Sequence, residues 1–490
     1  AVNTSDVASG FSDTVKVTPE FKGPKWYVST SGISTNEGSS TAPLSHLDGA
    51  IEKAASGDTV VVLKGTHSGS NNRGINFDDS SKPIVIMGDP SYAADSTIID
   101  AGGRDRHFVF DNGEDTTYQV IGLTLYNGSS GHGGSVYVYN NSNPLFKNVV
   151  FKGNTNAYDS WEGGGAVYIH YASPVFYDCR FEGNTRDYTS DDNNAAYGGA
   201  IWIQNHNSGQ PATRIIRCIF KDNVAKGQRD ARGGALYARE APVTILNSLF
   251  YNNTTRSSVD NSDSYESKGG AIYLDGPTSY DGSDWQGAEA KIINCTIANN
   301  YSLSDKSSSH TVGAGIFLNG WGRDEKFYSF NNIVWGNTVT TVNYAKRSVQ
   351  SDFAGDLNKV TLERDYNVYQ DHDPGDTYVG DHVLGIDPMF VNSGAGDYSL
   401  SDASHLIGAG TASLESISAP SNDINNTLTR GTPPDIGAYE NALDSSPYPT
   451  AVKNLAGSSG GSSVNLTWDA NTESDMAYYM VAKSTTDDFT

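Results

Sequence analysis

The chain has 490 residues, of which 37% are hydrophobic, and its 57 acidic residues against 33 basic ones give a formal net charge of −24. This acidity argues against general nucleic-acid binding, and most of the charges are expected only to keep the protein soluble. Three cysteines are too few for a disulfide framework or a zinc site, and no apolar run is long enough to span a membrane.

The N-terminal part of the chain predicts an irregular arm, a strand, a helix and a second strand. Residues 1–23 are polar and form the arm, and the first strand begins at Trp26. Residues 43–55 carry apolar side chains at helical spacing, and Gly57 ends the helix. The strand over 59–63 follows. The residues expected on the buried face of the helix are Leu44, Leu47, Ile51 and Ala54.

Residues 26–67, which contain WYVS, GDTVVV and GTH, resemble the N-terminal cap of secreted right-handed parallel β-helix proteins. The resemblance implies a solenoid whose open end is covered by an amphipathic helix, because an uncovered end exposes apolar interior and unpaired strand edges. The chain begins at Ala1 without methionine, which is what removal of a signal peptide would leave. We therefore expect a secreted or cell-surface protein.

The centre of the chain contains a repeated glycine heptad, typified by residues 269–275 (GGAIYLD). Such repetition indicates a solenoid. The resemblance of the N-terminal cap implies that this solenoid is an all-β, right-handed parallel β-helix with an N-terminal capping helix. The other copies cover residues 133–139, 164–170, 198–204, 233–239 and 313–319.

A second strand in each repeat places an apolar residue three positions before an asparagine. Asparagines stacked in this way can bond to one another and to turn backbone, so a structural role is expected. These asparagines are Asn154, Asn184, Asn223, Asn253 and Asn300.

Each of the three cysteines, Cys179, Cys218 and Cys295, lies five residues before such an asparagine. The period-2 alternation of a strand puts them on the inward face, where they are expected to be inert core thiols. A disulfide between Cys179 and Cys218 is the less favoured alternative.

The C-terminal part of the chain predicts the end of the β-helix and the start of a second module. Residues 433–440 (PPDIGAYE) resemble the end of β-helix domains in secreted bacterial surface proteins, often from Bacteroidetes. The predicted β-helix domain therefore covers 24–442, and a Pro/Ser-containing linker covers 443–450. Residues 451–490 resemble the start of a fibronectin type III module, whose sandwich needs about 90 residues, so further C-terminal domains that could attach the protein to the cell surface are expected.

In the heptad, positions four and six are aliphatic and are expected to face inward, which leaves positions three, five and seven outward. Position five would form an aromatic column along roughly 24 Å, at about 4.8 Å per coil. Sugar rings stack on aromatic faces, so this column predicts an open glycan groove. The alternative is a purely structural aromatic ladder. The column consists of Tyr137, Tyr168, Trp202, Tyr237, Tyr273 and Phe317.

The segments just before the glycines are rich in basic residues for so acidic a chain, which favours an anionic, uronate-containing or sulfated glycan. The alternative pairs these cations with local carboxylates: Arg239 with Asp275, and Arg232 with Asp230 or Glu266. The predicted substrate-binding residues are Tyr168, Trp202, Tyr237, Tyr273, Tyr197, Arg232, Lys268, Gln204 and Trp161.

The expected chemistry is polysaccharide cleavage. A glycoside hydrolase needs two carboxylates, and a polysaccharide lyase needs a base and a cation that neutralises the uronate carboxyl group. The hydrolase is slightly favoured, although no segment matches a known catalytic motif of pectate lyases, polygalacturonases or chondroitinase B-like enzymes. The predicted catalytic residues are Glu162, Asp230, Glu266, Asp275, His170 and Arg239.

No cofactor or metal is required by this interpretation, and Ca²⁺ is an option only through the Asp-rich stretches 191–194 and 371–376, which lack EF-hand spacing. The expected partner is an extracellular polysaccharide, without nucleic acid or membrane insertion. The alternative function is a non-catalytic adhesin or glycan-binding protein, because the glycine heptad paired with F-x-x-N also resembles repeats of bacterial polymorphic outer-membrane proteins.

Overall fold

The computed structural model describes most of the chain. The described residues are 21–77, 82–157, 163–189, 195–204, 210–258, 267–276, 289–305, 311–320, 325–341, 353–356, 360–370, 385–446, 453–460 and 463–469.

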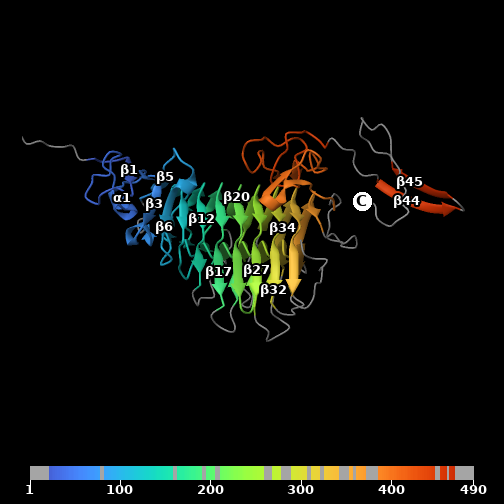
Figure 1. Cartoon of the computed structure of the whole chain (residues 1–490), viewed down its shortest axis with the longest axis horizontal. Helices are drawn as coiled ribbons and strands as arrows, with labels where there is room; N and C mark the ends of the chain where they lie inside the picture. The colour runs from blue at the N-terminus through green and yellow to red at the C-terminus, as the bar shows by residue number, and fades with distance from the viewer. Residues whose placement is uncertain are drawn as a thin grey trace, which may run out of the picture.

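The described residues form a parallel β-helix whose coils stack along the long axis of the molecule (Figure 1). Sheet I, which begins at the N-terminus, pairs its strands in parallel throughout. Its strands in spatial order are β1 (Lys25–Val28), β2 (Thr59–Val62), β5 (Val85–Gly88), β8 (Gln119–Ile121), β11 (Leu145–Lys147), β15 (Val175–Tyr177), β20 (Thr213–Ile216), β25 (Val243–Leu246), β30 (Glu289–Ile293), β34 (Glu325–Phe330) and β38 (Val360–Asp365).

Sheet II contains the glycine heptads, whose last four residues form the strands. Its strands are β4 (Ile75–Asn76), β7 (Phe108–Phe110), β10 (Val136–Tyr139), β14 (Val167–His170), β19 (Ile201–Gln204), β24 (Leu236–Arg239), β29 (Ile272–Asp275), β33 (Ile316–Asn319) and β37 (Phe353–Asp356).

Sheet III contains the strands that precede the repeated asparagines. Its strands are β3 (Gly65–Ser68), β6 (Thr97–Asp100), β9 (Thr124–Tyr126), β12 (Val150–Lys152), β16 (Arg180–Glu182), β21 (Ile219–Lys221), β26 (Leu249–Tyr251), β31 (Thr296–Ala298), β35 (Ile333–Trp335) and β39 (Val368–Tyr369).

Two smaller sheets carry the chain from sheet III back to the glycines of sheet II. Sheet IV consists of β13 (Thr155–Asn156), β17 (Thr185–Tyr188), β22 (Val224–Gly227), β27 (Thr254–Ser257), β32 (Tyr301–Ser304) and β36 (Thr338–Thr341). Sheet V consists of β18 (Ala196–Tyr197), β23 (Ala231–Arg232) and β28 (Ser267–Lys268). The predicted parallel β-helix is confirmed, whereas the strands of sheets IV and V were not predicted from the sequence.

The N-terminal cap is α1 (Leu47–Lys53), which lies at the N-terminal end of the solenoid (Figure 1). Leu47 and Ala50 are buried, and Leu44 and Ala54 on either side of the helix also join the core, while Ile51 is only half-buried. The helix is shorter than predicted, but it covers the end of the solenoid as expected. Three short 3₁₀ turns accompany the strands: Ser70–Asn72, Ala94–Ser96 and Ser393–Ala395.

The interior of the solenoid is built from side chains stacked coil upon coil. In sheet III the rings of Phe151, Phe181, Phe220 and Phe250 lie 4.4–4.6 Å apart and almost parallel. The predicted asparagine ladder is present: each Nδ2 donates to the Oδ1 of the next coil at 2.8–3.0 Å, from Asn154 through to Asn337. All members are buried.

The three cysteines are buried free thiols, as predicted. Burial raises the pKa of Cys295 to about 12, so this thiol is protonated and unreactive at neutral pH. The favoured interpretation, an inert core column, holds, and the alternative disulfide is not formed.

Residues 385–446 form a C-terminal segment that packs on the outer face of sheet III, where Leu406 and Ile436 meet Ile333. It contains two short antiparallel hairpins, β40 (Phe390–Asn392) with β41 (Asp397–Leu400), and β42 (Ser413–Leu414) with β43 (Ile417–Ser418).

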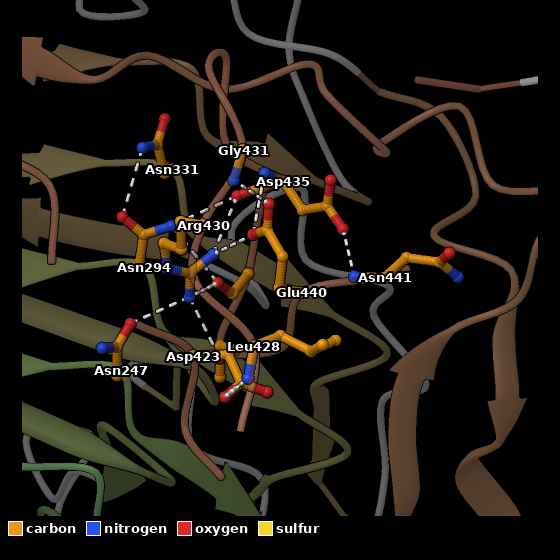
Figure 2. A network of polar contacts seen from close by, with 12 residues as sticks. Asn247, Asn294, Asn331, Asp423, Leu428, Arg430, Gly431, Asp435, Glu440 and Asn441 are labelled. Carbon is orange, nitrogen blue, oxygen red and sulfur yellow. Dashed lines mark hydrogen bonds and ion pairs between the residues drawn. The ribbon is translucent and has the colours of Figure 1, made fainter. Parts of the chain in front are cut away.

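Figure 2 shows the polar network that holds this segment in place, centred on Arg430. The Nη1 of Arg430 lies 2.9 Å from the Glu440 carboxylate, and its Nη2 donates to Asn247 of the β-helix at 2.8 Å. Asn294 donates to the backbone of Asp435, and Asn331 donates to that of Thr411. Thr411, Arg430 and the PPDIGAYE motif (433–440) therefore dock the segment onto three successive coils, and we call these residues the C-terminal clamp.

Beyond the segment, β44 (Lys453–Gly460) and β45 (Ser463–Asp469) pair as an antiparallel hairpin where two strands were expected. Residues 470–490 of the expected fibronectin type III-like module lie outside the described residues, as do the arm residues 1–20. That module and the domain limits stay predictions.

Candidate functional site

The strands of sheet II place the same heptad position of every coil in one column. Tyr168 pairs in register with Trp202, which pairs with Tyr237, Tyr273 and Phe317 in turn. The ring centroids of successive members lie 4.9–5.7 Å apart. The predicted aromatic column therefore exists, and we keep that name for it.

The prediction that this column is an open sugar platform is wrong. Tyr168, Trp202, Tyr237 and Tyr273 are only 0–3% exposed, and they form a small apolar core of their own. Position three of the heptad also differs from the prediction, because Ala166, Ala200, Ala235 and Ala271 belong to the main core rather than to an outward track.

The column is buried because the residue before each glycine pair folds back over it. Gly198, Gly233 and Gly269 have φ of +63° to +67°, a left-handed turn that reverses the chain. Tyr197 consequently stacks on Tyr237 of the next coil, at 4.8 Å and 19°.

The other residues before the glycines repeat this arrangement with cations. The Arg232 guanidinium lies 5.4 Å from the ring centre of Tyr273, and Lys268 Nζ lies 4.6 Å from that of Phe317. We call His132, Tyr197, Arg232 and Lys268 the cover layer; His132 stacks on Tyr168 at 5.6 Å. The layer replaces the aromatic platform with a partly exposed surface that includes the cations Arg232 and Lys268.

Position seven of the heptad forms a second column at the carboxyl end of the same strands. We call it the polar column, and its members in register are Tyr139, His170, Gln204, Arg239, Asp275 and Asn319. Its middle is tightly bonded: the Tyr237 hydroxyl donates to Asp275 at 2.5 Å, and Asn319 Nδ2 donates to the same carboxylate at 2.7 Å.

Arg239 is the solvent-reaching cation of the polar column. Its side chain is about one-third exposed, and its Nε lies 3.4 Å from the carboxylate of Glu240. Burial alone would lower the pKa of Arg239, but Tyr237, Asp275 and Glu240 outweigh it and raise the pKa. The same balance, with Tyr273 and Tyr197 foremost, raises the pKa of Arg232 well above its ordinary value. Both guanidinium groups are therefore permanently cationic.

The two tyrosines at the centre of the site are proton donors rather than bases. Burial is the largest cause that raises the pKa of Tyr197, and it raises the pKa of Tyr237 well above the ordinary value. A phenol with a raised pKa stays protonated at neutral pH, so neither side chain supplies a phenolate.

The predicted carboxylates differ from an exposed catalytic pair. Asp230 is 7% exposed and Asp275 is 8% exposed. Asp230 lies 3.5 Å from Arg232, which is one of the local ion pairs considered above, and Asp275 accepts the two hydrogen bonds described. Glu162, Glu266 and Trp161 lie outside the described residues.

The structure brings together most of the predicted residues on one face of sheet II. His170, Arg239, Arg232 and Lys268 are half-buried there, and Gln204 is buried in the polar column. Tyr171, which follows a heptad in left-handed conformation, was not predicted from the sequence, and Tyr139 was given no role of its own. The position of Tyr171 directly after a repeated strand is the sequence signal that could have identified it.

Among the described residues, no group of three or more His, Cys, Asp or Glu side chains could hold a metal ion. The stretches 191–194 and 371–376, on which the calcium option rests, lie outside them. No helix within the described ranges is both long and apolar enough to cross a bilayer.

Comparison with known proteins finds no matching family model. The uncharacterized protein YwoF of Bacillus subtilis (strain 168) is 34% identical over 100 residues, which are 19% of this chain and 21% of that protein. The chain thus matches about a fifth of the length of this curated relative.

Three solved structures of limited similarity complete the comparison. Pectate lyase Pel9A is 16% identical, with a TM-score of 0.39 over 85% of this chain and 96% of that one. A rhamnogalacturonan lyase is 13% identical, with a TM-score of 0.39 over 75% and 91%. Pectin methylesterase PemA from Erwinia chrysanthemi is 10% identical, with a TM-score of 0.29 over 77% and 98%.

Proposed function

We propose that the protein is an extracellular, polysaccharide-active β-helix protein that binds an anionic glycan along the polar column and the cover layer. The observation that carries this proposal is the set of Arg232, Arg239 and Lys268 on one face of a chain whose net charge is −24. Local cationic character on so acidic a molecule attracts anionic ligands and orients them.

The chemistry of these cations suits uronate or sulfate groups. A guanidinium is planar and offers paired donors to a carboxylate or sulfate, and the raised pKa values of Arg232 and Arg239 keep it charged. Lys268 lies over Phe317, one coil beyond Arg232. Cations on neighbouring coils would meet successive charged sugars of an extended chain, since coils repeat every ~4.8 Å.

For the reaction, we propose β-elimination rather than hydrolysis. Hydrolysis needs two carboxylates that face the glycosidic bond, whereas Asp230 and Asp275 are buried and already hydrogen-bonded or ion-paired. Elimination needs a cation beside the uronate carboxylate and a base, and Arg239 and His170 of the polar column are suited to these two roles.

In this mechanism Arg239 neutralises the uronate carboxylate, which acidifies the proton on the adjacent carbon. The backbone of His170 lies two coils away, roughly 10 Å along the axis, so the uronate is placed between the two side chains and His170 removes the proton from the side opposite Arg239. The electron pair forms a carbon–carbon double bond as the bond from the β carbon to the glycosidic oxygen breaks. The leaving oxygen takes a proton from solvent, which gives one new reducing end and one unsaturated uronate.

The test is incubation of the purified protein with a panel of uronate-containing, sulfated and neutral polysaccharides. Elimination is expected to give the ultraviolet absorbance of unsaturated uronates, and Arg239→Gln is expected to lower the rate by at least about tenfold, the effect of one lost charged contact. Arg214→Gln, an exposed arginine on β20 of sheet I, is the matched control and is expected to have no effect.

The second candidate is a glycan-binding protein without catalysis, and the buried, partnered state of Asp230 and Asp275 favours it. The same incubation discriminates the candidates. New reducing ends without ultraviolet absorbance would indicate a hydrolase. Binding that depends on Arg239, without any new ends, would indicate the adhesin, and absence of binding to every anionic polysaccharide would overturn the proposal.

A further inference from the structure

The aromatic column surfaces at its N-terminal end, one coil before the buried section. Tyr137 is half-buried there, and Tyr139 of the same strand is 36% exposed. Their rings are nearly parallel, at 5.7 Å and 9°, and Tyr137 also stacks on Tyr168 at 5.6 Å and 5°. Tyr139 is thus the exposed end of a continuous stack whose remaining members are packed against the protein.

Side chains of the following coil complete this end of the polar column. The His170 ring lies 5.4 Å from that of Tyr139, and Tyr171 stacks on His170 at 4.1 Å. Tyr171 has φ +51°, a conformation that is uncommon for an aromatic residue and is held by its surroundings. Three neighbouring rings therefore form a preordered aromatic and imidazole surface.

The chain turns away directly after Tyr139, which keeps its ring at a corner. Asn140 and Asn141 both have left-handed φ, +57° and +63°. Sheet II contributes no ring on the other side of Tyr139, because β7 ends at Phe110 and the residue beside Tyr139 in the preceding coil is Asp111. Among the described residues, no member of the cover layer that buries Tyr168 to Phe317 lies over Tyr139.

We propose that Tyr139, with His170 and Tyr171 beside it, is a stacking subsite for one pyranose ring of the bound polysaccharide. The inference rests on the proposed function for the class of ligand. Tyr139 and Arg239 lie three coils apart in the polar column, which is roughly 14 Å. A glycan chain along the column would place one sugar on the uncharged Tyr139 subsite and others beside the cations.

The two parts of such a site differ in their response to salt. Stacking on a ring is driven by apolar contact, so it persists when ionic strength rises. Attraction between exposed charges is screened within about 10 Å at 0.1 M salt. Loss of Tyr139 should therefore weaken binding by the same factor at low and high salt, whereas loss of Arg239 should matter mainly at low salt.

The experiment measures the retardation of the whole chain in native gels that contain alginate, polygalacturonate, heparin or neutral xylan, at two salt concentrations. Tyr139→Ala is expected to weaken retention about five- to tenfold, the scale of one lost aromatic contact. Tyr139→Trp, which keeps a ring, is expected to retain binding. Tyr92→Ala removes an exposed tyrosine elsewhere and is the control. Circular dichroism and the thermal midpoint verify that each variant is folded.

The outcomes separate this inference from the proposed function. Unchanged retention of Tyr139→Ala together with weakened retention of Arg239→Gln overturns the subsite and leaves the proposed function standing. Weakened retention of Tyr139→Ala alone supports the subsite and overturns the anionic part of the function. If the unmodified protein is retarded by none of the polysaccharides, both the Tyr139 subsite and the proposed function are overturned.

Discussion

Asn253 shows how a single side chain connects three coils. Its Nδ2 donates to Phe220 O and to Asn300 Oδ1, both at 2.9 Å, and its Oδ1 accepts from the backbone N–H of Asn223 and from Asn223 Nδ2. If Asn253 were removed, each buried donor or acceptor that loses its hydrogen bond would carry a desolvation cost of about 1–3 kcal/mol. We expect Asn253→Ala to lower the free energy of unfolding by about 3 kcal/mol or more, measured by urea denaturation.

The control for this prediction is Asn71→Ala, since Asn71 is exposed near the N-terminal cap. It should change the free energy of unfolding by less than about 0.5 kcal/mol. Equal effects of the two substitutions would mean that the ladder contributes little beyond ordinary surface asparagines.

At the residue scale the sequence predicted the interior well but not the exposure of the site. The asparagine and cysteine columns follow from repeat spacing alone, because register in a solenoid places equivalent residues in one stack. Whether the ring of Tyr237 is exposed to solvent cannot be predicted from repeat spacing. Strand alternation says only that its ring leaves the main core, and a second layer, here Tyr197 of the neighbouring coil, decides whether solvent reaches it.

At the scale of the element, the two glycines of each heptad have different roles. The first, with its left-handed φ, turns the chain so that the cover layer forms, and the second allows neighbouring coils to approach closely. A Cβ on Gly234 would lie 2.0 Å from the carbonyl oxygen of Gly270 in the next coil and 2.7 Å from the backbone of Thr254. These are backbone atoms that cannot move aside. Gly234 is therefore needed for the close approach of neighbouring strands inside the solenoid.

Gly234→Ala is therefore expected to lower the thermal midpoint strongly or to prevent folding, through steric overlap. Gly183→Ala is the matched substitution, because Gly183 has φ +62° and a Cβ added there would meet no atom within 4 Å. It bears only the left-handed backbone cost, about 1–2 kcal/mol. Similar midpoints for the two variants, measured by differential scanning calorimetry, would contradict the steric explanation.

At the scale of the whole molecule, the C-terminal clamp makes stability depend on pH. Burial is the main cause that raises the pKa of Asp435 to about 7, although the backbone N–H groups of Gly408 and Asn441 donate to its carboxylate. The unfolded value is about 3.9. The folded protein thus holds an extra proton between these values, so this stabilising contribution is full below about pH 4 and is lost as pH rises through about 7.

We expect the free energy of unfolding to fall between these pH values by at most about 4 kcal/mol through this group. Asp435→Asn should remove that part of the pH dependence, while Glu52→Gln, which changes an exposed carboxylate on α1, should leave it. Urea denaturation across the range measures both. Parallel profiles for Asp435→Asn and the unmodified protein would exclude Asp435 as the titrating group.

The clamp also bears on how a stack of coils comes apart. A solenoid whose repeats touch only their neighbours can lose its terminal coils one at a time, as a zipper opens from its end. Here one segment is bonded to Asn247, Asn294 and Asn331, which belong to three successive coils. Opening the last of these coils requires the segment to detach from the others, so the C-terminal third of the solenoid should exchange its amide protons as a single cooperative unit.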